Sequence, residues 1–165
     1  MRREVAAGSH ASSRRVRVSV LDRLLADSDS DPTADALHSL RDAVHRDLEA
    51  LLNAHRPWRS VPSHMDHLRT SSFSYGVPDV TSGAFNHNEP REALRRDIET
   101  TIRRMEPRLA QVHVHLADDA DRLRSVLRLR IEALLKVEPI VARIAFDTVV
   151  NVATAEMVLQ LRNGA

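Results

Sequence analysis

The chain has 165 residues, enough for one domain with an apolar core, and a formal net charge of only +1. Hydrophobic residues make up 42% and charged residues 28%, ordinary values for a soluble protein, and the absence of cysteine excludes disulfides and thiol catalysis. No apolar run approaches the length of a membrane span, and the basic start lacks the apolar stretch of a secretory signal. We therefore expect a cytoplasmic protein without direct membrane insertion.

The N-terminal part of the chain is predicted to contribute little to the core. Residues 1–18 are rich in Arg, Ser and Ala without periodicity, which indicates a disordered basic arm, while residues 19–165 are expected to form a single domain. Residues 19–25 have the spacing of a short amphipathic helix. Such a helix is too short to be stable alone in water, so it should dock on this domain or on a partner.

The first long helix is predicted to run from Thr33, a suitable N-cap, to Asn53, with Pro57 preventing its continuation. Apolar side chains recur every three or four residues along it, which is one face of a helix. These residues are Leu37, Leu40, Val44, Leu48, Leu51 and Leu52. Residues 57–89 lack such periodicity, and a connection this long is usually functional or mobile.

A second long helix is predicted from Pro90, which suits a first helical position, to Met105. Its buried face is expected to hold Leu94, Ile98, Ile102 and Met105. Its outward face is expected to hold Arg91, Arg95, Arg96, Asp97, Glu99, Arg103 and Arg104.

Four strands are predicted after the second helix, because the apolar period changes from 3.6 to 2. The core-facing residues are Val112, Val114 and Leu116, then Leu127, Leu129, Ile131 and Ala133, then Ile144, Phe146, Thr148 and Val150, and finally residues within 157–161. Consecutive strands with short connections favour an antiparallel meander. The expected class is α+β, with two long helices packed on a small, mainly antiparallel four-stranded sheet.

The change of period occurs at Glu106-Pro107-Arg108. Pro107 ends the helix because it lacks an N–H and pushes Glu106 toward extended geometry. The corner holds a carboxylate and a guanidinium two residues apart, and Arg can grip a carboxylate or backbone carbonyls with its planar fork. A lone pair of this kind is often only a solvated corner, so the surrounding motifs decide its interpretation.

Five stretches, in this order, resemble the TssE family, the type VI secretion baseplate protein related to the small wedge protein of contractile phage tails. The stretches are residues 19–25 (SVLDRLL), residues 46–53 (RDLEALLN), Tyr75-Gly76-Val77-Pro78-Asp79, Glu106-Pro107-Arg108-Leu109 and Phe146-Asp147-Thr148-Val149. The family's usual Thr-Gly-Glu turn in the last hairpin is replaced by Ala153-Thr154-Ala155-Glu156, which has no Gly.

The resemblance implies a structural role in a cytoplasmic baseplate docked at the inner membrane, with TssF, TssG and TssK as partners. It also implies a surface on which the contractile sheath of TssB and TssC begins to assemble. The candidate interaction residues are Glu106, Pro107 and Arg108 at the corner, Tyr75, Gly76, Pro78 and Asp79 in the loop, and Arg128 and Arg130 on a strand. A sheet edge could also be extended by a strand of a partner.

The sequence disfavours two other classes of function, a muramidase and a nucleic-acid binder. Phage relatives have carried a lysozyme-like label, but a muramidase needs two carboxylates, one of which must hold its proton. Only Glu106 is offered by the motif, and Arg108 beside it favours the charged form. A nucleic-acid binder is disfavoured because acids balance the arginines and aromatics are only 3%. We therefore expect no enzymatic activity, no cofactor, no metal and no nucleic-acid partner.

Overall fold

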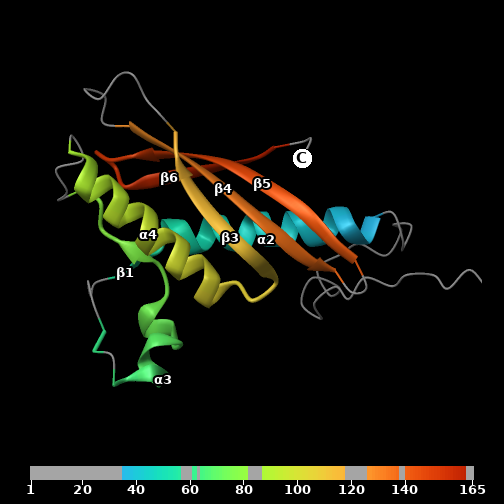
Figure 1. The fold of residues 1–165 in the computed structure, drawn as a ribbon, viewed down its shortest axis with the longest axis horizontal. Coiled ribbons are helices and arrows are strands. Elements are labelled where there is room, and N and C mark those ends of the chain that lie inside the picture. Colours follow the sequence, from blue (N-terminus) through green and yellow to red (C-terminus); the bar gives the residue numbers. More distant parts are fainter. Residues whose placement is uncertain are drawn as a thin grey trace, which may run out of the picture.

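The computed structural model describes residues 35–56, 61–62, 64–81, 87–117, 126–137 and 140–162. The proposed basic arm, the short helix at residues 19–25, the Thr33 cap and Trp58 lie outside these residues. The described part is an α+β fold in which helices α2 (Asp35–Asn53) and α4 (Asn88–Met105) pack with one four-stranded sheet. Figure 1 shows α2 crossing behind the sheet and α4 running beside strand β3. The predicted fold class is confirmed.

The sheet is the predicted antiparallel meander, in the order β3-β4-β5-β6. Its strands are β3 (Leu109–Leu116), β4 (Val126–Val137), β5 (Ile140–Asn151) and β6 (Glu156–Leu161). Strands β4 and β5 are longer than expected, because pairing continues to Val137↔Ile140 across the region where Lys136 to Pro139 was expected to end the second strand. The apolar alternation identified each strand, whereas its length is set by pairing with its neighbour.

One face of the sheet and one face of each long helix form a single core. Its most deeply buried members include Phe146 of β5, Leu48 and Leu52 of α2, and Ile98 and Ile102 of α4. The apolar positions predicted for the strands are buried in this cluster, with Leu116 only partly buried. The other face of the sheet carries exposed residues at alternate positions, as the period of two requires.

Two non-glycine residues in the described part of the chain have positive φ angles, which only the structure reveals. Gln111 has φ 48° and lies in an irregularity between Ala110 and His113 that shifts the register of β3 against β4. The shift lets Leu109 and Val112, three residues apart, both point into the core. Ala155 has φ 57° in the turn before β6, a conformation in which Gly would carry no Cβ penalty.

Helix α4 differs from the prediction at its start. It begins at Asn88 after His87, so Pro90 occupies the third helical position rather than the first. The early N–H groups of a helix have no intrahelical partner, which explains why Pro is tolerated there. Arg91 was predicted to face outward but is only 8% exposed, because it lies one helical turn before Leu94 on the buried side of α4.

The region between the helices contains short elements that the sequence pattern did not predict. Strands β1 (His55–Arg56) and β2 (Val77–Pro78) form a small parallel pair directly after α2. Between them lie the one-turn helix α3 (Asp66–Arg69) and the 3₁₀ turn η1 (Ser72–Ser74), which extend away from the main body in Figure 1. None of the helices in the described part of the chain is long and apolar enough to cross a membrane.

Candidate protein-interaction site

The Glu106-Pro107-Arg108 corner is a closed electrostatic unit rather than a pair of solvated charges. Helix α4 ends with the Glu106 N–H still donating to Ile102 O at 2.9 Å, and Pro107 then turns the chain into β3. The Glu106 carboxylate accepts three hydrogen bonds from Arg108: from the Arg108 backbone N–H (3.2 Å), from Nε (2.7 Å) and from Nη2 (2.5 Å). Because Glu106 is only 6% exposed, this forked contact neutralises a buried carboxylate.

Arg108 also connects this corner to the first long helix. Its Nη2 donates to Asp47 Oδ2 of α2 at 2.6 Å, so one guanidinium holds two carboxylates from segments about 60 residues apart. The hydrogen bond to Glu106 is the main reason that the pKa of Arg108 is raised above its ordinary value, with Asp47 adding to it against the effect of burial. The arginine therefore stays charged at every relevant pH.

The corner is fixed on its other side by strand β4. The Lys136 backbone N–H donates to Arg108 O at 2.9 Å, and Lys136 Nζ donates to Pro107 O at 3.1 Å. The position of the turn is thus determined by the end of α4, by α2 and by β4 together, which makes its exposed surface rigid.

The loop motif Tyr75–Asp79 lies beside this unit. Burial raises the pKa of Tyr75 above its ordinary value of 10.0, and the negative charges of Asp47 and Glu106 raise it further. These charges act over short distances, so the phenol shares the neighbourhood of both carboxylates. Tyr75 nevertheless keeps 39% of its surface exposed and is available to a partner.

Gly76 is what lets the loop approach the end of α2. Its φ is +99°, and a Cβ at this position would lie 2.2 Å from Ala54 O. That same carbonyl oxygen accepts a 2.9 Å hydrogen bond from the Val77 N–H. Pro78 follows in the short parallel pairing with Arg56, and Asp79 then accepts from the Thr81 N–H at 2.9 Å in a local turn. Gly76 and Pro78 therefore shape the loop, while Tyr75 and Asp79 are its exposed members.

Arg128 and Arg130 do not belong to this cluster. Both lie on the exposed face of β4, and Arg130 lies six residues, or about 20 Å, along the strand from the corner-facing Lys136. Arg130 Nε donates to Asp147 Oδ1 of β5 at 3.0 Å, an exposed cross-strand ion pair. The structure therefore divides the predicted interaction residues into one corner cluster and one separate sheet face.

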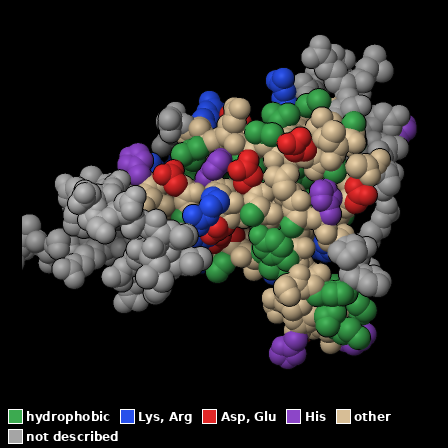
Figure 2. All heavy atoms as spheres, turned by 180° about the vertical axis from the view of Figure 1, so that it is seen from behind, with side chains coloured by type: hydrophobic (Ala, Val, Ile, Leu, Met, Phe, Trp, Pro, Cys, Tyr) green, Lys and Arg blue, Asp and Glu red, His purple; other side chains and the backbone are tan. Residues whose placement is uncertain are grey.

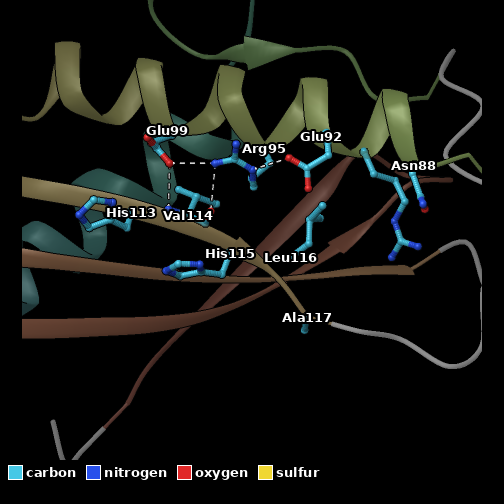
Figure 3. A pocket seen from close by; sticks show the side chains of 10 residues that line it. Asn88, Glu92, Arg95, Glu99, His113, Val114, His115, Leu116 and Ala117 are labelled. Carbon is cyan, nitrogen blue, oxygen red and sulfur yellow. Dashed lines mark hydrogen bonds and ion pairs between the residues drawn. The ribbon is translucent and has the colours of Figure 1, made fainter.

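The edge of β3 is already occupied by side chains of α4. Val112 O accepts from the Arg103 guanidinium at 2.6 and 3.1 Å, and Val114 O accepts from Arg95 Nη1 at 3.2 Å. The Val114 N–H donates to Glu99 Oε2 at 3.2 Å, a contact that Figure 3 shows together with the Arg95–Glu99 pair. A partner strand would have to displace these charged groups, so we do not propose strand addition along Val112–Val114.

The edge of β6 is occupied in the same way from α2. Asn53 Nδ2 donates to Met157 O at 2.8 Å while the Met157 N–H donates to Asn53 Oδ1 at 2.9 Å, so the amide imitates a neighbouring strand. His45 Nε2 lies 3.2 Å from Leu159 O. Asn53, the last residue of the RDLEALLN motif, therefore closes the sheet edge as well as ending the helix.

The cluster can shape a surface, but its geometry offers no acid–base chemistry. Glu106 is fully engaged by a permanent cation, and the nearest carboxylate, Asp47, is held by the same guanidinium. Both carboxylates are thus oriented by Arg108. Asp47 was not among the predicted site residues, although it lies within the RDLEALLN motif.

A comparison with family models gives an independent result. The model of the baseplate wedge protein gp25 family matches residues 38–140, a stretch that includes most of α2, the Tyr75–Asp79 loop, α4 and the corner. No curated protein and no solved structure matches the chain. Since the matched stretch covers more than half of the sequence, the chain belongs to the baseplate wedge protein gp25 family.

Proposed function

We propose that this protein is the TssE-type subunit of a type VI secretion baseplate, located in the cytoplasm at the inner-membrane-docked assembly. In this role it binds TssF, TssG and TssK and presents a surface on which the TssB/TssC sheath begins to assemble. Family membership supports a structural role in a phage-tail-like baseplate. The finer assignment rests on the five motifs of the chain and on one observation: three of them, separated in sequence, meet around Arg108.

The function of Arg108 in this proposal is to orient the surface. Its guanidinium is directed at Asp47 and Glu106, and only 28% of its side chain is exposed. The partner would instead contact the exposed surface of Pro107 together with Tyr75 and Asp79. Loss of Arg108 would then alter the relative positions of α2, the loop and the corner, and the sheath would lose a rigid starting surface.

A variant that removes one charge from the corner is expected to be less stable than the wild type. Sequence reasoning expects Arg108→Ala to leave the fold intact, whereas the structure shows that Glu106 would lose its only cation while 7% exposed. We expect on the order of 2 kcal/mol of destabilisation, less than for a fully buried pair because Arg108 is partly solvated. A test of function must therefore separate loss of the surface from loss of stability.

The test compares Arg108→Ala with Asn53→Ala in the native cell, using a fluorescently tagged sheath subunit. Asn53→Ala should lower the free energy of unfolding by a similar amount, because it removes the hydrogen bonds at the β6 edge and leaves the corner unchanged. We expect sheaths to be lost with Arg108→Ala and kept with Asn53→Ala, at matched protein levels. Normal sheath assembly with folded Arg108→Ala would contradict the role of the corner.

A second measurement tests the assignment to type VI secretion itself. The wild-type chain is co-purified with TssF and TssG from the same genome, alongside Arg108→Ala. Binding by both proteins would leave the corner free for the sheath, as proposed. Binding by wild type alone would make the corner a baseplate contact, and failure of the wild type to bind would reject the TssE-type assignment.

A further inference from the structure

The segment 64–75, here called the finger, projects from the body and is apolar at its surface. It contains α3 and η1, and Figure 1 shows it extending beyond the helices and the sheet. Four of the seven exposed large hydrophobic side chains of the described residues lie in it: Met65, Leu68, Phe73 and Tyr75, each 38–42% exposed. Figure 2 shows hydrophobic side chains grouped on this lobe. Exposed apolar groups concentrated on a short projection are characteristic of interaction sites.

The finger is ordered by its own hydrogen bonds. Leu68 O accepts from Ser71 Oγ and from Ser74 Oγ, both at 2.8 Å, and the Ser74 side chain is buried. Ser71 Oγ in turn accepts from the Phe73 N–H at 3.3 Å. The apolar side chains are therefore presented on a fixed backbone, which lowers the entropic cost of binding.

A cluster of three arginines lies where the finger meets the body. Arg104 of α4 donates to Arg69 O of the finger at 3.3 Å. Burial lowers the pKa of Arg104, and the positive charges of Arg69 and Arg56 lower it further. Among the residues that the structure describes, Arg56 Nε is buried and has no hydrogen-bond partner. The carboxylate paired with the cluster is Asp66, at 3.6 Å from Arg69 and with 84% of its side chain exposed.

We propose that the finger and this arginine cluster form a docking surface for a partner protein that presents an apolar pocket bordered by at least two carboxylates. The apolar side chains would fill the pocket, and the carboxylates would neutralise Arg56, Arg69 and Arg104. A carboxylate at this place would also offset the positive charges of Arg56 and Arg69 that act on Arg104. This surface adjoins the Glu106–Arg108 corner, because Tyr75 belongs to both, and it does not depend on which contractile system the protein serves.

The features favour a protein over an anionic lipid surface. Arg104 and Arg69 are held together at the base of the finger by a hydrogen bond, whereas binding to a membrane plane favours cations spread along an amphipathic helix. The helix in the finger has a single turn, and Asp66 projects from it beside the apolar side chains. An exposed carboxylate opposes contact with anionic headgroups but is compatible with a shaped protein pocket.

The experiment is site-specific photo-crosslinking of the full chain in its native cell. A benzophenone amino acid replaces Phe73 in the finger, and the same amino acid at the exposed Ala93 of α4 is the control position. The cross-linked peptide is identified by mass spectrometry. Arg69→Glu and Arg104→Glu test the charges, and Arg96→Glu, an equal charge change on the solvent side of α4, is their matched control.

We expect Phe73 to cross-link to one protein, at an apolar segment with two or more Asp or Glu residues in its peptide. The yield should fall at least about tenfold with Arg69→Glu or Arg104→Glu and should not change with Arg96→Glu, because charge complementarity discriminates strongly against like charges. Arg69→Glu serves if Arg104→Glu fails to fold. A cross-linked segment without acidic residues, an adduct with lipid, or a yield no greater than that at Ala93 would overturn the proposal.

Discussion

Replacing Gly76 by Ala is the most direct test of how the loop motif is held. The change adds one methyl group and alters no charge or hydrogen-bonding group. In the structure that methyl carbon would lie 2.2 Å from Ala54 O and 2.7 Å from Ala54 C, both backbone atoms that cannot rotate away. The loop must therefore leave its position on the end of α2.

The expected cost has two parts. At φ +99° an L residue is strained by about 1–2 kcal/mol relative to Gly. Moving the loop breaks the 2.9 Å hydrogen bond from the Val77 N–H to Ala54 O, a further loss of about 1 kcal/mol. We expect the free energy of unfolding to fall by about 2–3 kcal/mol in total, which corresponds to a Tm lower by about 4–12 °C for a chain of this size.

The measurement is urea denaturation of both proteins, followed by circular dichroism, with the slope checked for two-state behaviour. The matched control is the reverse change, Ala155→Gly, where Ala155 has φ 57° and is 4% exposed. Removing the backbone strain at residue 155 should raise the free energy of unfolding by about 1 kcal/mol, and losing the buried methyl group should lower it by about 0.8 kcal/mol. The free energy of unfolding should therefore hardly change. A loss below about 1 kcal/mol for Gly76→Ala would refute the reasoning, because strain alone accounts for that much.

Two further predictions concern the sheet edge and the loop. Asn53→Ala should lower the free energy of unfolding by about 2 kcal/mol, because it leaves the Met157 N–H and C=O unpaired at the β6 edge. Amide exchange at Met157 should accelerate, while Asn53→Asp, which keeps the acceptor for that N–H, should protect it. The only tyrosine, Tyr75, should titrate above pH 10.0 when followed by phenolate absorbance, and Asp47→Asn should lower its midpoint. Because the pKa of Tyr75 is raised in the folded state, the contribution of Tyr75 to stability is present below pH 10.0 and is lost as pH rises through the folded-state pKa. An unshifted titration midpoint would place the phenol away from both carboxylates.

The sequence by itself determined the class of the fold and the identity of most core residues. The period of 3.6 in α2 and α4 and the period of two in the strands are local properties that burial enforces along each element. The meander followed because consecutive strands of this kind pair with one another. The motifs likewise indicated the family before the family comparison confirmed it.

Only the tertiary structure decided which polar residues face one another. Asp47 and Arg108 lie 61 positions apart, and nothing in their local patterns indicates that they form an ion pair at 2.6 Å. The closure of the β6 edge by Asn53 was equally invisible. The physical reason is that the pattern of apolar burial can be predicted within one helix or strand, whereas a polar contact depends on how two elements are placed relative to each other. That placement arises from the packing of the whole core, which no single segment encodes.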